Sequence, residues 1–321
     1  MTSPSPSADG EQPEVLVVAK LWPPMMESLR SNYRVHDRIH QSDPTAFTAV
    51  SQRIRAISAS GESKVSRELI AQLPALEIIS VFGVGYDGID VAAARERGIA
   101  VTNTPDVLND EVADLAIGLV LAVSRRIPQA DRYVREGHWA NGPMPLARKV
   151  SGARLGIVGL GRIGAAIAKR AEAFGMSISY TARSAKAGNG YHYSPSAEAL
   201  AAEVDFLVVI TPGGAGTHKL IDAKVLHALG KDGYLINVAR GSVVDEAALV
   251  EALQSGTIAG AGLDVFENEP NVPAALIALD NVVLTPHVGS ATWQTRRAMA
   301  DRAFGNLQAH FAGKPLLSPV P

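Results

Sequence analysis

The chain has 321 residues, and 47% of them are hydrophobic, which is enough for two domains with separate cores. A formal net charge of −2, with lysine and arginine dispersed, argues against nucleic acid or an anionic membrane as the main partner. The absence of cysteine excludes disulfides, thiol catalysis and cysteine-ligated metals, and we predict a cytoplasmic protein without a metal site.

The first third of the chain alternates short apolar runs with helical patterns. Residues 1–13 are rich in serine and proline and lack the basic start and apolar stretch of a signal peptide, so we predict a disordered tail. Beyond it, we predict strands at 15–19, 56–59, 76–81 and 100–103, and helices at 66–73 and 91–97. Strands that alternate with helices of this length indicate a parallel sheet with crossover helices.

The alternation continues after a long helical pattern at 110–126, which Pro128 follows. Its apolar stretch at 115–123 is too short to span a bilayer, so we predict no membrane segment. Later strands are predicted at 178–181, 206–210, 233–238, 260–265 and 281–285. A last helix at 295–311 needs a sheet to cover, and a return to the first domain is the simplest solution. We therefore predict that the second domain is inserted into the first.

A glycine-rich motif lies near the middle of the chain, between an apolar run at 154–158 and a helix-forming run at 165–171. Its residues are Gly159, Leu160, Gly161, Arg162, Ile163 and Gly164. In this strand–turn–helix context the glycines permit a tight turn, a close approach to a pyrophosphate and helix–strand packing. The motif therefore predicts a dinucleotide site.

The next strand end indicates which dinucleotide is bound. An NAD site usually has an acidic residue about twenty residues after the motif, on the ribose 2′-hydroxyl. Here no carboxylate occurs between Glu172 and Glu198, and Arg183, Ser184 and Lys186 stand in that region. These side chains suit a 2′-phosphate, so we predict NADPH, or NADP+, with NADH as a weaker alternative.

Three further strand ends carry polar residues, and the carboxyl ends of parallel strands meet in one crevice. They provide Arg240, Glu269 and His287. Arginine can bind a carboxylate through two hydrogen bonds and polarise a ketone, and a protonated histidine can donate to the developing alkoxide. A carboxylate on the other imidazole nitrogen orients the ring and raises its pKa. The set predicts hydride reduction of a 2-oxo acid.

Six motifs together carry a resemblance to a known family, at 82–90, 103–105, 155–164, 237–245, 263–270 and 285–292. The chain resembles the D-isomer-specific 2-hydroxyacid dehydrogenases, and within them the NADPH-preferring glyoxylate/hydroxypyruvate reductases. The likeness extends from residue 15 to residue 319. It implies that Arg240 binds and polarises the substrate, that His287 is the acid/base, and that Glu269 tunes His287.

The resemblance also implies further site residues. The backbone of Val84 and Gly85 matches a loop that binds the substrate carboxylate, and Gly61 matches a second turn on the substrate side. The residues implied at the cofactor, besides the glycine motif and the 2′-phosphate set, are Thr211, Pro212, Thr217, Val238, Ala239, Arg240, Asp264, His287 and Gly289.

The resemblance implies two Rossmann-like, doubly wound α/β domains, with the nucleotide domain inserted into a flavodoxin-like substrate domain. We place the substrate domain at 14–103 and 288–321 and the dinucleotide-binding domain at 104–287. A homodimer built around the long helix is implied as well. Trp139 matches a residue that reaches the partner subunit's site in reductases of this kind, although simple packing is an equal alternative.

Other functions remain as alternatives. A reductase of bulkier 2-keto acids, such as phenylpyruvate, is the nearest one. Formate dehydrogenases pair the histidine with glutamine, so Glu269 argues against them. A nucleotide-sensing corepressor shares the fold but characteristically carries extended peptide-binding regions.

Overall fold

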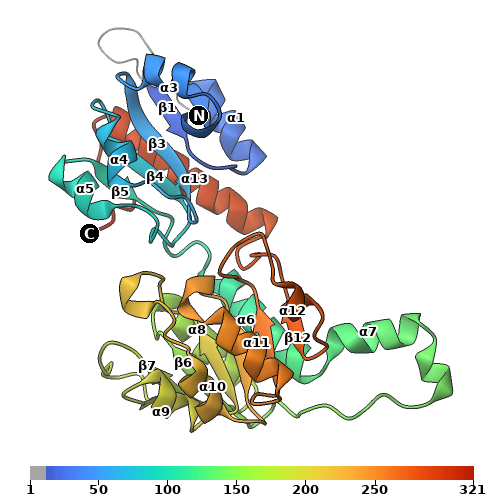
Figure 1. The fold of residues 1–321 in the computed structure, drawn as a ribbon. Helices are drawn as coiled ribbons and strands as arrows, with labels where there is room; N and C mark the ends of the chain where they lie inside the picture. Colours follow the sequence, from blue (N-terminus) through green and yellow to red (C-terminus); the bar gives the residue numbers. More distant parts are fainter. Residues whose placement is uncertain (1–11) are drawn as a thin grey trace. The chain divides into compact units, whose positions relative to one another are not determined.

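The computed structural model describes residues 12–321, so residues 1–11 of the predicted tail lie outside the described residues. The chain divides into two compact units, Met1–Leu108 with Ala291–Pro321 (unit 1) and Asn109–Ser290 (unit 2) (Figure 1). The boundaries predicted at 103/104 and 287/288 lie a few residues earlier. As a division into substrate and dinucleotide domains, they remain a prediction.

Unit 1 contains a five-stranded parallel sheet in the order β2-β1-β3-β4-β5. The strands are β1 (Glu14–Val17), β2 (Arg34–Asp37), β3 (Ile54–Ser60), β4 (Ile78–Phe82) and β5 (Ala100–Thr102). This is the order of flavodoxin-like folds. Strands β1 and β4 are buried along their whole length, which explains why they consist of apolar runs rather than alternating patterns.

The helices of unit 1 cover both faces of this sheet. They are α1 (Pro23–Asn32), α2 (Ile39–Ser42), α3 (Pro44–Val50), α4 (Arg67–Ala71), α5 (Val91–Glu96) and α13 (Trp293–Phe311). The last of them packs against β4, where the Ser80 hydroxyl donates to the Ala303 carbonyl at 2.9 Å. The prediction that the final helix returns to the first domain is confirmed.

Unit 2 contains a seven-stranded parallel sheet in the order β12-β11-β10-β9-β6-β7-β8. The strands are β6 (Arg154–Val158), β7 (Ser177–Thr181), β8 (His192–Tyr193), β9 (Phe206–Val209), β10 (Tyr234–Asn237), β11 (Gly260–Leu263) and β12 (Val282–Leu284). The chain winds outward from β6 in both directions, so the order reverses between β6 and β9. Ligands of doubly wound sheets bind at such a switch point, and the predicted fold class is confirmed.

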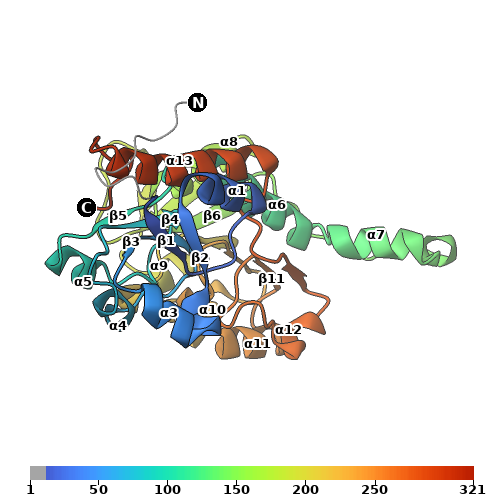
Figure 2. The same cartoon turned by 90° about the horizontal axis from the view of Figure 1, so that it is seen from above.

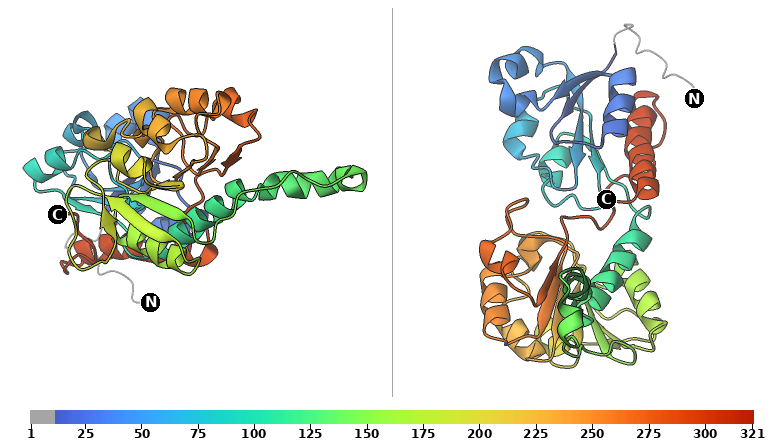
Figure 3. Two further views of the ribbon diagram at one scale, coloured as in Figure 1. Left: turned by 90° about the horizontal axis from the view of Figure 1, so that it is seen from below. Right: turned by 90° about the vertical axis from the view of Figure 1, so that its right-hand side faces the viewer.

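The helices of unit 2 are α6 (Asn109–Ser124), α7 (Ile127–Arg135), α8 (Arg162–Glu172), α9 (Ala197–Ala201), α10 (Ala223–Leu229), α11 (Glu246–Gln254) and α12 (Ala274–Ile277). Three short 3-10 turns occur at η1 (His138–Asn141), η2 (Ala215–Thr217) and η3 (Gly241–Val243). Helix α7 extends away from the sheet of its own unit (Figures 2 and 3). No helix within residues 12–321 is long and apolar enough to cross a membrane.

Helix α7 begins where the sequence pattern predicted an end. The predicted helix at 110–126 stops at Ser124, because Arg126 adopts a left-handed backbone with φ 54°. Pro128 then lies in the first turn of α7, where its missing N–H has no helical partner to lose. Pro128 therefore follows the predicted helix, as expected, and also lies at the start of the next one.

Candidate functional site

The three glycines of the 159–164 motif have three different surroundings. Gly159 has φ +105°, and a Cβ there would lie 2.9 Å from the Thr211 backbone. A Cβ on Gly164 would lie 2.3 Å from the Gly159 carbonyl oxygen, whereas a Cβ on Gly161 would meet nothing within 4 Å. The first glycine therefore makes the turn, the third packs helix α8 onto β6, and the second leaves the turn open. This arrangement fits a pyrophosphate lying against the backbone at the start of α8.

The predicted 2′-phosphate residues follow the end of β7. Arg183, Ser184 and Lys186 are all exposed, and they occupy the segment that joins β7 to β8. The Lys186 ammonium donates a hydrogen bond to the carbonyl of Leu160, inside the glycine motif. The structure thus brings the Lys186 side chain to the glycine motif.

The residues predicted for the cofactor wall follow β9. Thr211 lies directly against Gly159, as the close approach of their backbones shows. The Thr217 hydroxyl donates to the Pro212 carbonyl at 2.7 Å, which closes the loop at the start of η2. This loop therefore flanks the glycine motif at the switch point of the sheet.

Arg240 follows the end of β10. The buried Asn237 side chain shapes this strand end, because its amide donates to the Arg240 carbonyl at 3.1 Å and its carbonyl accepts the Ala239 N–H at 3.1 Å. One guanidinium nitrogen of Arg240 donates to the Ala239 carbonyl at 2.7 Å. A backbone turn fixed by a buried side chain thus carries the arginine, as expected for a residue that must be held in register.

Glu269 and His287 form a hydrogen-bonded pair. Glu269 Oε2 lies 2.8 Å from His287 Nδ1, and Glu269 Oε1 accepts the Phe266 N–H at 2.9 Å. Burial raises the pKa of Glu269, but the hydrogen bond and charge of His287, with a contribution from Arg240, bring that pKa below its usual value. Glu269 is therefore an ionised carboxylate held on both oxygens, and it fixes the orientation of the imidazole.

Asp264 holds the loop that carries His287. Its buried carboxylate accepts the Thr285 hydroxyl at 2.6 Å, the Val288 N–H at 2.8 Å and the Gly289 N–H at 2.8 Å. His287 itself has φ 52°, in the left-handed region that non-glycine residues seldom adopt. The sequence alone predicts Asp264 at the cofactor and does not identify this contact with the loop. An acidic residue at the end of a buried strand was the available signal.

The predicted substrate loops lie in unit 1. A Cβ on Gly83 would lie 2.9 Å from the Gly61 Cα, so the turn after β3 and the turn after β4 touch each other. The Asn103 side chain donates to the Val84 carbonyl at 2.9 Å, which fixes the segment leading to Gly85. The structure therefore brings Gly61, Val84 and Gly85 to the same edge of the unit 1 sheet.

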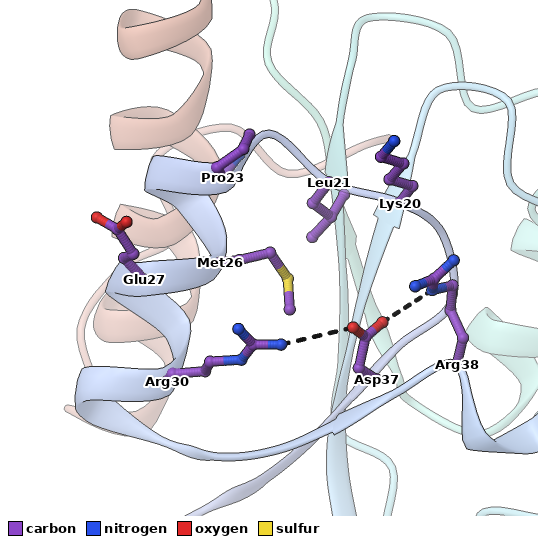
Figure 4. Close-up of a pocket in the computed structure, with 8 residues that line it drawn as sticks. All are labelled: Lys20, Leu21, Pro23, Met26, Glu27, Arg30, Asp37 and Arg38. Atoms are coloured by element: carbon purple, nitrogen blue, oxygen red, sulfur yellow. Dashed lines mark hydrogen bonds and ion pairs between the residues drawn. The ribbon is translucent and has the colours of Figure 1, made fainter.

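A surface cavity of about 250 Å³ also occurs in unit 1, between the ends of β1 and β2 and the first turns of α1 (Figure 4). Its charged rim is largely self-paired, because Asp37 lies 2.9 Å from Arg38 and 3.6 Å from Arg30. None of the predicted site residues lines this cavity. We therefore assign the candidate site to the strand ends and not to this cavity.

The geometry of unit 2 suits a nucleotide-dependent reaction that moves one proton. An open glycine turn lies at the switch point of the sheet, and a carboxylate–imidazole pair and an arginine lie at neighbouring strand ends. An imidazole whose Nδ1 is bound by a carboxylate can give or take a proton at Nε2. One edge of this sheet therefore carries a turn that can bind a nucleotide, a positively charged arginine and an imidazole that can transfer a proton.

Comparisons with known proteins agree with this geometry. Residues 117–289 match the family model for the NAD binding domain of the D-isomer specific 2-hydroxyacid dehydrogenases. A hydroxyphenylpyruvate reductase of Plectranthus scutellarioides is 54% identical over 280 residues, which are 87% of this chain and 89% of the relative. A glyoxylate/hydroxypyruvate reductase of Arabidopsis thaliana is 54% identical over 267 residues, which are 83% of this chain and 85% of the relative.

A solved structure supports the same assignment. It is an NADPH-dependent glyoxylate/hydroxypyruvate reductase from Sinorhizobium meliloti in complex with NADP and malonate. Its sequence is 51% identical, the TM-score is 0.91, and the match covers 97% of both chains. Sequence, fold and comparisons together establish that the chain belongs to the D-isomer-specific 2-hydroxyacid dehydrogenase family.

Proposed function

We propose that this protein is an NADPH-dependent reductase that converts small 2-oxo acids, glyoxylate and hydroxypyruvate first, into 2-hydroxy acids. The observation that carries the proposal is the Glu269–His287 pair at 2.8 Å, on strand ends beside Arg240 and in the unit that holds the glycine turn. Relatives named glyoxylate/hydroxypyruvate reductase support this substrate class.

The chain's residues supply binding and proton transfer. When bound, NADPH would supply the hydride for the carbonyl carbon of the 2-oxo acid. Arg240 binds the substrate carboxylate and polarises the ketone through its guanidinium. His287 donates the proton at Nε2 to the carbonyl oxygen, while Glu269 keeps Nδ1 protonated and stabilises the imidazolium. The backbone N–H groups of Val84 and Gly85 bind the carboxylate, and Gly61 belongs to the second substrate turn.

The cofactor residues divide into two groups. The turn built by Gly159, Gly161 and Gly164 holds the pyrophosphate, which approaches at Gly161, and Arg183, Ser184 and Lys186 bind the 2′-phosphate that distinguishes NADPH from NADH. The second group faces the remainder of the dinucleotide and consists of Thr211, Pro212, Thr217, Val238, Ala239, Asp264 and Gly289. The NADP complex of the Sinorhizobium relative supports this choice of cofactor.

Reduction of bulkier 2-keto acids is the second candidate. The relative from Plectranthus scutellarioides, which is 54% identical, is named a hydroxyphenylpyruvate reductase. An aromatic keto acid needs the same arginine and histidine, so the site geometry described above serves both substrates. Pocket size and not the chemistry separates these two candidates.

A steady-state panel tests the proposal and separates the candidates. Glyoxylate, hydroxypyruvate and phenylpyruvate are each assayed with NADPH and with NADH. We expect the highest kcat/KM for one of the two small acids with NADPH, and at least a tenfold advantage over NADH, which is about 1.4 kcal/mol. A higher kcat/KM for phenylpyruvate would favour the second candidate, and equal use of both cofactors would contradict the cofactor assignment.

We also propose that the protein is a cytoplasmic homodimer joined through α6 and the α7 arm. Helix α7 has no buried residue, and the large apolar side chains of Ile127, Val134 and Trp139 are more than half exposed. Exposed apolar side chains along an amphipathic helix and the η1 turn after it are typical of a surface that a second subunit covers. We assign Trp139 to the partner subunit's site. Light scattering on the wild type should give twice the chain mass, and a monomer would contradict the proposal.

A further inference from the structure

The segment between β7 and β8 carries the predicted 2′-phosphate residues, and hydrogen bonds from two side chains hold its central residue, Lys186. It runs from 182 to 191, and most of its residues are exposed. Long exposed segments order themselves at an entropic cost when they bind a ligand. A protein that binds a phosphate through such a segment loses less binding free energy if the segment is already ordered before the ligand arrives.

Tyr180 provides the first tie. It lies one residue before the end of β7, and its side chain is among the largest that are fully buried. The Lys186 backbone N–H donates to the Tyr180 phenol oxygen at 2.6 Å, and the phenol O–H faces the Lys186 carbonyl at 3.4 Å. One buried hydroxyl thus takes up both polar groups of a single backbone residue in an exposed loop. These two contacts join the middle of the loop to the last residues of β7.

Asn189 provides the second tie. Its side-chain amide donates to the Lys186 carbonyl at 2.9 Å, and its side-chain carbonyl accepts the Tyr191 N–H at 2.8 Å. The Lys186 side chain then crosses to the glycine motif, where its ammonium donates to the Leu160 carbonyl. Tyr180 and Asn189 therefore both hold the backbone of Lys186, and its ammonium lies at the glycine motif.

We propose that Tyr180 and Asn189 are positioning residues for NADPH: they hold the 182–191 segment so that Arg183 and Lys186 present a preformed site to the 2′-phosphate. The inference rests on the proposed function, because it assigns the 2′-phosphate to this segment. Neither residue is a predicted ligand of the nucleotide. Each acts through the backbone of Lys186, and the effect is confined to nucleotides that carry a 2′-phosphate.

Calorimetric titration of the full chain with adenosine 2′,5′-bisphosphate and with adenosine 5′-phosphate tests this proposal without catalysis. In Tyr180→Phe, we expect the Kd of the bisphosphate to rise about three- to tenfold, the range that corresponds to losing one hydrogen bond. The Kd of adenosine 5′-phosphate should stay unchanged. Equal weakening of both ligands, or no weakening of either, would overturn the proposal.

Tyr193→Phe is the matched control. The Tyr193 ring packs on the Tyr180 ring with centroids 5.5 Å apart. Its hydroxyl makes a long contact of 3.5 Å with the carbonyl of Ala182, the first residue of the segment, whereas the Tyr180 hydroxyl binds Lys186 at 2.6 Å. We expect this variant to bind both ligands as the wild type does. A Tyr193→Phe effect as large as that of Tyr180→Phe would show that the hydroxyl contact with Lys186 has no special role, which contradicts the proposal.

Two further variants keep the test decisive. Asn189→Ala leaves the strand untouched, so it serves if Tyr180→Phe does not fold, and it should weaken the bisphosphate selectively. Unchanged binding in Asn189→Ala would then overturn the proposal.

Arg183→Ala separates a failure of the proposed function from a failure of this inference. If Arg183→Ala keeps the wild-type preference for the bisphosphate, the proposed function loses its 2′-phosphate site. If it loses the preference while Tyr180→Phe and Asn189→Ala keep it, only this inference fails.

Discussion

The backbone carbonyl of Asp264 accepts the His287 N–H at 2.9 Å, and the Asp264 carboxylate holds the N–H groups of the next two residues. His287 thus sits in a left-handed conformation that the strand end before it stabilises. A strained backbone persists at a functional site only where its surroundings determine it. The relationship makes Asp264 the support of the proposed acid/base, besides its assignment to the cofactor.

Asp264→Asn should therefore damage both stability and turnover. The amide replaces one carboxylate oxygen by an NH2 group that opposes the N–H donors of the loop. Loss of hydrogen bonds to a buried charged acceptor should lower the free energy of unfolding by about 2–4 kcal/mol. Urea unfolding measures this change, and Thr285→Val, which removes only one of the three donors, should cost less. Equal stability of Asp264→Asn and the wild type would contradict the role of Asp264 as a clamp.

Glu269→Gln should change the pH dependence of the reaction. The wild-type carboxylate favours the charged form of His287, so its removal makes that form harder to maintain. We expect the alkaline limb of the kcat/KM profile for glyoxylate reduction to move to lower pH, with a loss of about tenfold or more at neutral pH. A profile that is lower at every pH but has the same shape would contradict this account.

Gly161→Ala and Gly164→Ala should separate binding from folding. A methyl group at 164 would lie 2.3 Å from the Gly159 carbonyl oxygen, so the Tm of this variant should be lower than that of the wild type. A methyl group at 161 meets nothing within 4 Å and has a backbone that alanine adopts, so the fold should survive. It would nevertheless occupy the space through which the pyrophosphate approaches. Thermal unfolding and NADPH fluorescence titration distinguish the two, and wild-type affinity in Gly161→Ala would contradict the assigned site.

Glu14→Gln should reduce stability in a pH-dependent manner. Burial raises the pKa of Glu14, but hydrogen bonds from Arg53 and His36, both at 2.7 Å, hold that pKa below its usual value. A lowered pKa contributes stability above the unfolded-state value of 4.5, and this contribution is lost as the pH falls through the folded-state pKa. The variant should cost about 1–2 kcal/mol at pH 7 and less at pH 4.

Urea unfolding at the two pH values checks this sign. Glu27→Gln is the control, because Glu27 is an exposed carboxylate on α1. It should leave the free energy of unfolding within about 0.5 kcal/mol of the wild type at both pH values. A difference between Glu14→Gln and the wild type that grows as the pH falls would contradict the assignment.

The fold could be predicted from the sequence wherever strands are buried on both faces. Apolar runs such as those of β4 and β9 leave no other interpretation once crossover helices separate them. Edge strand β2, which reads Arg-Val-His-Asp and is half-exposed, carries no such signal and was missed. Helix α1 was missed as well, because its proline pair resembles a loop although proline is well tolerated in a first turn.

The candidate site could be predicted in its residue types but not in its supports. Arg240, Glu269 and His287 follow from strand ends and from the resemblance to a family. Two supporting contacts could not be predicted: that of Asp264 with the 285–289 loop, and that of Tyr180 with Lys186. No local sequence pattern indicates which residues these side chains contact. A tyrosine inside a buried strand looks like core until the structure shows what its hydroxyl binds.

The central claim is that His287 gives the proton that accompanies hydride transfer to a 2-oxo acid. The most direct test measures NADPH oxidation with glyoxylate by the wild type and by His287→Asn, together with the Kd of NADPH for both. We predict that kcat/KM falls by about a hundredfold or more, whereas the Kd of NADPH changes far less, because the glycine turn and the 2′-phosphate residues remain. Turnover in His287→Asn equal to that of the wild type would contradict the account.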